Sequence, residues 1–91
     1  MYYSIEGVFY EYEWAERLFA EGKFAEAAEH YGLMNAHYEN ADDIEKLSGP
    51  DCPVTMLMDG VERSFPSVNE CLRRASDRMK TIRRKAKNKK N

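Results

Sequence analysis

Residues 18–31 read LFAEGKFAEAAEHY and decide the fold, because they hold the end of one amphipathic helix and the start of another. From residue 8 to residue 21 apolar side chains recur at the spacing of one helix face, and a second such face begins at Phe24. Gly22 lies between them, where a left-handed C-terminal cap belongs. Two helices joined by so short a break fold back on one another. The sequence therefore predicts an antiparallel helical hairpin over residues 8–39.

Each predicted helix has one apolar face. The two faces comprise Val8, Tyr12, Trp14, Ala15, Leu18 and Phe19 in the first helix and Phe24, Ala27, Ala28, Tyr31, Met34 and Tyr38 in the second. Ala27 and Ala28 are small enough to let the two backbones approach closely. We expect these faces to pack against one another.

A β-hairpin is predicted over residues 54–65. The dipeptide Asp59-Gly60 separates two short apolar runs and favours a type I′ turn. The implied register pairs Met58 with Val61 and Val54 with Phe65. A lone two-stranded hairpin is marginal in water, so we expect its apolar face, Val61 included, to pack on a helix.

A long amphipathic helix is predicted over residues 67–86. Ser67 and Glu70 form a capping box, and apolar residues then recur at spacings of four and three as far as Ala86. We expect residues 85–91 to be a basic flexible tail, because they are too polar to pack.

The 91 residues suit one domain. We expect a single compact domain over residues 1–84 of mainly α class: the helical hairpin, the small β-hairpin and the long C-terminal amphipathic helix. No apolar run approaches the ~20 residues of a membrane span, and the N-terminus lacks the basic region of a secretory signal. We therefore expect a cytoplasmic protein, without membrane association, in which Cys52 and Cys71 are reduced thiols.

The order Gly22, Phe24, Ala27, Ala28, Tyr31 resembles the second half of a tetratricopeptide repeat. The resemblance covers about thirty residues in one copy, whereas such repeats ordinarily need about three copies to bury their faces. It implies a helical hairpin. Peptide binding in that family uses a concave groove that neighbouring repeats form, and the sequence contains no second copy.

The C-terminal segment is similar to small helix-turn-helix modules found beside homing-endonuclease domains. The residues that carry the similarity are FPSV at 65–68, Glu70 and TIRR at 81–84. It implies a strand pair followed by two helices, the second being a recognition helix. This chain has Ser76 and Asp77 where the family's turn has a glycine and an apolar residue, and the unbroken spacing favours one straight helix. Both arrangements, one helix or a helix-turn-helix, stay open for this segment.

Charge is divided unevenly along the chain. Residues 1–45 contain eleven acidic and two basic residues, a net charge of −9, whereas residues 71–91 contain ten basic residues and one acidic residue, a net charge of +9. The basic strip could neutralise phosphates and gain affinity from the release of counterions. We therefore predict a regulatory protein that contacts the nucleic-acid backbone with little sequence specificity. The predicted contacts are Arg73, Arg74, Arg78, Lys80, Arg83, Arg84, Lys85, Lys87, Lys89 and Lys90.

The N-terminal half supports an alternative. Ten of the eleven aromatic residues precede residue 40, more than a small core encloses, and acidic residues lie among them. The chain could thus be an inhibitor or adaptor that docks on a host or partner protein, as small accessory proteins of phages and mobile elements do. The predicted interface residues are Tyr2, Tyr3, Phe9, Tyr10, Glu11 and Glu13. A homodimer through the apolar seam of residues 68–86 is a third possibility.

The sequence gives little support for catalysis. His30 and His37 are seven positions apart, about 10 Å along a helix, so one metal ion cannot bind both directly. No glycine-rich loop for phosphate is present, and no carboxylate lies in an apolar run that would tune its pKa. We expect no enzyme activity, no small-molecule substrate, no cofactor and no metal.

Overall fold

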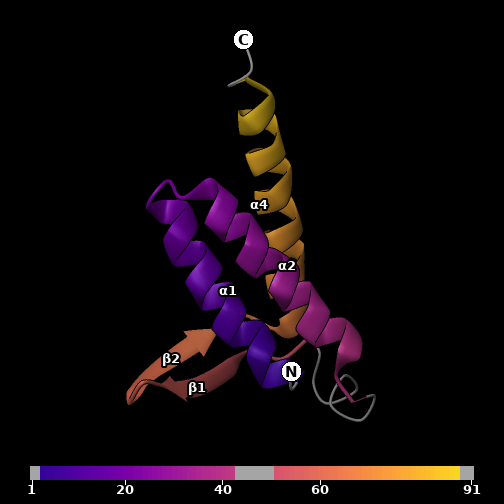
Figure 1. The fold of residues 1–91 in the computed structure, drawn as a ribbon. Coiled ribbons are helices and arrows are strands. Elements are labelled where there is room, and N and C mark those ends of the chain that lie inside the picture. The colour runs from indigo at the N-terminus through magenta and orange to yellow at the C-terminus, as the bar shows by residue number, and fades with distance from the viewer. Residues whose placement is uncertain (1–2, 43–50, 89–91) are drawn as a thin grey trace.

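The structure, a computed structural model, describes residues 3–42 and 51–88. Within these residues the protein is mainly helical, as predicted, and Figure 1 shows two helices packed as a hairpin, a third helix beside them and a small sheet below. The elements are α1 (Ile5–Ala20), α2 (Phe24–Asn40), β1 (Val54–Met58), β2 (Val61–Phe65) and α4 (Val68–Asn88). None of the described helices has an apolar stretch long enough to cross a lipid bilayer.

The turn between α1 and α2 confirms the prediction made from Gly22. This glycine has a φ of 79°, and its N–H donates to the carbonyl of Phe19 at 3.0 Å. The next N–H, from Lys23, donates to the carbonyl of Leu18 at 2.9 Å. These two bonds form a Schellman motif, which satisfies carbonyls that the end of a helix leaves free. The chain therefore reverses within three residues, and α1 and α2 pack side by side (Figure 1).

The start of α1 was predicted three residues too late. Ser4 caps the helix, because its Oγ accepts the N–H of Gly7 at 3.0 Å. The N–H of Ser4 in turn donates to Nδ1 of the buried His37 at 3.3 Å. A Cβ at Gly7 would lie 2.3 Å from the same Nδ1, so only glycine lets α1 approach the His37 ring this closely. The cap and this contact fix the first turn of α1 on α2.

The β-hairpin has the predicted register, with Met58 opposite Val61 and Val54 opposite Phe65. Asp59 and Gly60 both have positive φ, 53° and 78°, as a type I′ turn requires. Met58 and Phe65 are buried, and Val54 and Met56 are half-buried. Val61 is 53% exposed, however, so the prediction that it faces a helix was wrong. It lies beside the turn, at the end of the hairpin opposite to Val54 and Phe65.

One uninterrupted helix, α4, follows the hairpin, so of the two arrangements open for this segment the structure has the single helix. Ser67 Oγ accepts the N–H of Glu70 at 3.2 Å, which is the predicted cap. The helix continues to Asn88, two residues past its predicted end at residue 86, and so includes the first part of the segment predicted as a tail. Lysine and alanine favour a helix, and cations in its last turn offset the helix dipole. Residues 89–91 lie outside the described residues.

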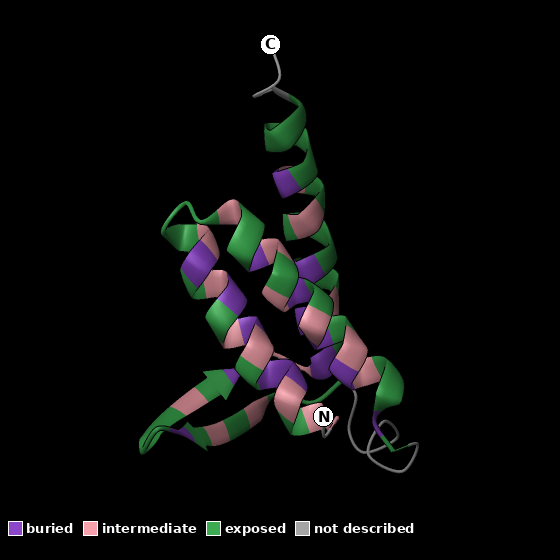
Figure 2. Cartoon of the chain, in the orientation of Figure 1, coloured by how far each residue is buried: buried purple, intermediate pink, exposed green. Residues whose placement is uncertain are grey.

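The apolar seam of α4 is buried inside the chain. Val68, Cys71, Ala75 and Ile82 are all buried, whereas Ala86 is exposed. Figure 2 shows why: the last turns of α4 extend past the helical hairpin and are exposed. A homodimer built through this seam would have to displace α1 and α2, which already cover it.

Phe65 joins the sheet to the helices. It is buried, with its ring centre 5.4 Å from that of Phe9 and 6.3 Å from that of Tyr12. The core therefore includes side chains of α1, α2, α4 and the β-hairpin (Figure 2).

Candidate functional site

The basic face of α4 is divided into two parts, and the part nearer the sheet is paired with acidic side chains. Arg73 and Arg74 both form ion pairs with Glu70, the second through Nε at 3.1 Å. Hydrogen bonding from Arg73 and then from Arg74 holds the pKa of the Glu70 carboxyl below its usual value. Two of the predicted phosphate contacts thus already have a negative partner.

The same part of α4 is also tied to α1. Nη1 of Arg74 donates to the Tyr12 hydroxyl at 3.4 Å. Nε of Arg78 donates to Glu16 at 3.2 Å, and its guanidinium carbon lies 4.4 Å from the centre of the Phe19 ring. Arg74 and Arg78 therefore help to hold α4 against α1, whereas Arg73 pairs with Glu70 inside α4.

The far part of α4 is different. Its four basic residues Lys80, Arg83, Arg84 and Lys87, which we call the basic quartet, are all exposed and line one shallow hollow of the surface. Their spacing places them on one side of the helix, over about 10 Å of its length. Within residues 3–42 and 51–88, none of the four has an acidic partner. Positive charge therefore faces water here.

Lys85 belongs to another side of the helix. Its Nζ lies 5.1 Å from the centre of the Phe24 ring, and together with Ala86 it lines a small groove against the start of α2. Lys85 thus faces its own fold, while the basic quartet faces away from it. Lys89 and Lys90, also predicted as contacts, lie outside the described residues.

The predicted protein-interface residues are placed less uniformly. Phe9 is only 2% exposed and packs on Phe65, so its prediction as a surface anchor was wrong. Tyr10 is 42% exposed, as the prediction requires. Tyr3 is half-buried, with its ring edge against His37, and Tyr2 lies outside the described residues.

The two predicted acidic contacts are already engaged. Glu11 lies 2.6 Å from Nδ1 of His30, and Glu13 forms ion pairs with Arg17 at 3.5 Å and with Arg63 at 3.2 Å. Both carboxylates are half-buried. They therefore help to join α1 to α2 and to the hairpin, and they present less free negative charge than the sequence implied.

An exposed apolar surface nevertheless exists, in a place that the sequence did not indicate. Trp14 was predicted on the buried face of α1 but is 54% exposed. Together with Tyr10, Leu57 and Val61 it forms what we call the apolar patch, in which Leu57 is 69% exposed. The Tyr10 hydroxyl donates to the Leu57 carbonyl at 3.4 Å, which links the two sides of the patch. If each residue of α1 is turned by 100° from the one before it, Trp14 lies off the apolar face that contains Val8. Its exposure could therefore have been predicted from the sequence.

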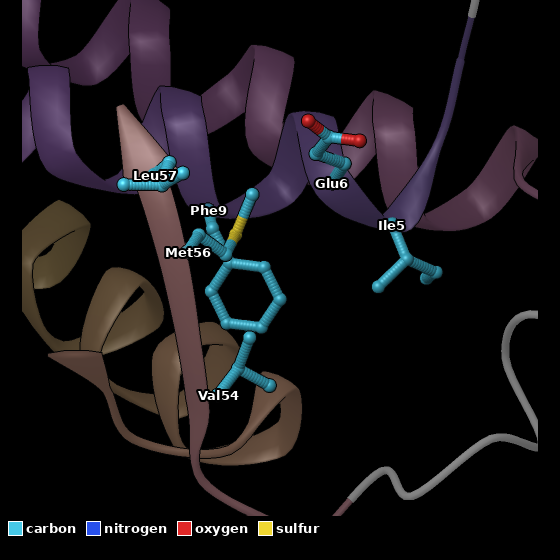
Figure 3. Close-up of a pocket in the computed structure, with 6 residues that line it drawn as sticks. All are labelled: Ile5, Glu6, Phe9, Val54, Met56 and Leu57. Carbon is cyan, nitrogen blue, oxygen red and sulfur yellow. The ribbon is translucent and has the colours of Figure 1, made fainter. Parts of the chain in front are cut away.

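Hollows flank the apolar patch between α1 and the hairpin. The larger one, of about 500 Å³, has walls of Ile5 and Phe9 from α1 and of Val54, Met56 and Leu57 from β1, with Glu6 at its edge. Figure 3 shows Phe9 and Met56 lying close together beside Val54, with Ile5 on the far side of the hollow. The smaller one, of about 230 Å³, lies beside Trp14, Met58 and Val61. Hollows of this size accept apolar side chains of a partner.

Potentially reactive groups inside the core are held in their neutral forms. Burial raises the pKa of the Cys71 thiol and of the Tyr12 hydroxyl to about 12 each. Burial and then the negative charge of Glu16 raise the pKa of Tyr31, whose hydroxyl meets no hydrogen-bond partner among the described residues. Cys52 and Cys71 are both free thiols, and Cys52 is exposed. In the part of the chain that the structure describes, no cluster of three His, Cys, Asp or Glu side chains could hold a metal ion.

The chain matches no known protein family, no curated protein sequence and no solved structure. The two candidate surfaces, the basic quartet and the apolar patch, therefore depend on the geometry of this chain alone.

Proposed function

We propose that this protein is a regulatory factor that binds nucleic acid through the basic quartet, chiefly by contacts with backbone phosphates. The observation that carries the proposal is the division of α4. The basic residues next to the core are paired with Glu70 and Glu16, whereas Lys80, Arg83, Arg84 and Lys87 have no acidic partner among the described residues.

The chemistry of the quartet suits phosphate. Its two arginines can each donate two parallel hydrogen bonds to a phosphate, and its two lysines act as point charges. All four are carried by one helix, so little backbone entropy is lost when the charges meet a linear polyanion. Contacts of this kind position a protein on nucleic acid but carry no sequence information.

The test is a salt titration of binding to a fluorescently labelled nucleic acid, followed by anisotropy. Four phosphate contacts should give a slope of log K against log salt of about −3.6. The double variant R83Q/R84Q should reduce the slope to about −1.8 and weaken binding at low salt, because two contacts are lost. The matched control R17Q/K23Q removes the same charge from exposed positions in α1 and in the turn before α2, and should leave the slope unchanged.

Two results would refute the proposal. One is an absence of binding at about 50 mM salt, where such electrostatic contacts are strongest. The other is a slope that R83Q/R84Q and R17Q/K23Q change equally, since net charge alone would then explain the affinity.

A second candidate function is docking on a partner protein, as an inhibitor or adaptor. The apolar patch supports it, because exposed tryptophan and tyrosine beside apolar hollows are typical of the centre of a protein interface. The free thiols suit a reducing compartment such as the cytoplasm.

This candidate predicts a partner that is captured by the intact protein after nuclease treatment and is lost with W14A/L57A. Leu57 is 69% exposed, whereas Trp14 is 54% exposed and its ring centre lies 5.6 Å from that of His30. The double variant should therefore lower the free energy of unfolding by about 1–3 kcal/mol, so its folding is checked by circular dichroism before the capture. The control T55A/E62A alters exposed residues of the same hairpin and should retain the partner. If W14A/L57A captured the partner as well as T55A/E62A does, the apolar patch would not be the surface that binds it.

A further inference from the structure

The end of α4 that carries the basic quartet stands clear of the fold. Ile82 is the last buried residue of the helix, and every described side chain from Arg83 to Lys87 is exposed. Figure 1 shows these turns extending past the turn between α1 and α2. A helix with its side chains is about 10–12 Å across, so this end is a narrow rod with basic residues along one side.

The rod has one side that is open to a ligand. Lys85 and Ala86 face Phe24 and Ala25 at the start of α2. The basic quartet lies on a different side. Asp77 is one turn before Lys80, but no ion pair joins the quartet to an acidic side chain of the described chain. A ligand of the basic quartet must therefore have a surface that can receive a protruding helix, and it must contact the helix on the side of the quartet.

Aromatic side chains do not support binding of unpaired bases at this end. Proteins that bind single strands combine a basic groove with exposed aromatic rings on which bases stack. The nearest rings here, Phe19 and Phe24, contact each other edge to face at 5.3 Å, and Arg78 and Lys85 cover them. The exposed Tyr10 and Trp14 lie beside the β-hairpin instead. A single strand would gain only charge contacts.

Resting on the proposed function, we propose that the nucleic acid bound by the quartet is double-stranded DNA in the B form, with the end of α4 in or against its major groove. That groove is about 12 Å wide and admits an α-helix, whereas the major groove of A-form RNA is deep and too narrow. The duplex also has twice the charge per unit length of one strand, which suits four cations on a rigid helix.

The test compares three probes of equal length and label at one salt concentration: a DNA duplex, one of its strands alone, and the RNA duplex of the same sequence. Binding to the DNA duplex should be at least about tenfold tighter than to either of the others. A DNA duplex with bulky C5 substituents on its pyrimidines, which fill the major groove, should bind more weakly than the unmodified duplex.

The outcomes separate this inference from the function on which it rests. Binding to no probe, or binding that R83Q/R84Q does not weaken, would refute nucleic-acid binding by the quartet altogether. Salt-dependent binding that needs the quartet but is as tight for the single strand or the RNA duplex would refute only the B-form assignment. Equal affinity for the filled and the unfilled major groove would also refute it.

Discussion

Replacing Phe65 by alanine is expected to lower the free energy of unfolding by about 3–5 kcal/mol, the usual loss for a buried phenylalanine. The ring is 5% exposed and lies between the hairpin and the helices, in contact with Phe9 and Tyr12. A two-stranded hairpin is only marginally stable alone, so loss of this contact should also loosen β1 and β2. Urea denaturation followed by circular dichroism measures the change.

The matched control is V61A in the same strand. Val61 is 53% exposed, so its replacement should change the free energy of unfolding by only ~0.5 kcal/mol or less. If F65A were as stable as V61A, the hairpin would not be held to the helices in the way that the structure indicates.

Alkaline pH should also destabilise the fold strongly. The pKa values of Cys71 and Tyr12 rise to about 12 from ordinary values of 9.0 and 10.0, and the pKa of Tyr31 is raised as well, in each case first because of burial. Above the ordinary values, the unfolded chain loses these protons while the folded chain keeps them. The native state then binds more protons, so stability falls as pH rises. Each group should contribute a loss of about 1.4 kcal/mol per pH unit.

The measurement is urea denaturation at pH 7, 9, 10 and 11. Stability should begin to fall near pH 9, where Cys71 would ionise in the unfolded chain, and should fall more steeply above pH 10, when both tyrosines contribute. The variant Y31F should show a shallower fall above pH 10. It should be about as stable as the native protein at pH 7, because the buried Tyr31 hydroxyl has no hydrogen-bond partner within residues 3–42 and 51–88. Constant stability from pH 7 to pH 11 would contradict the burial of these groups.

Local chemistry explains which parts of the fold could be predicted. Gly22 and Asp59-Gly60 determine their turns through backbone conformations that few other residues adopt, and both turns were predicted correctly. Ser67 likewise caps α4 through a bond to a residue three positions away. Such contacts are visible in the sequence because both partners are close together in it.

The features that were missed depend on residues far apart. Phe9 is buried because Phe65 covers it. Trp14 is an exception, because a count at 100° per residue already places it off the stripe of Val8. Arg78 meets Glu16, which lies 62 positions earlier. Charge counts could show that the two ends of the chain attract each other, but not which arginines would be paired and which would face water. The candidate site was therefore predicted as a strip, whereas the structure separates its far half.

The ion pairs between α4 and α1 also have a consequence for biosynthesis. A ribosome makes α1 and α2 before α4, so the acidic Glu16 and the aromatic side chains beside it meet water until Arg74 and Arg78 arrive. The nascent helical hairpin is thus incomplete, with a negative and partly apolar side against which α4 packs once it has been made.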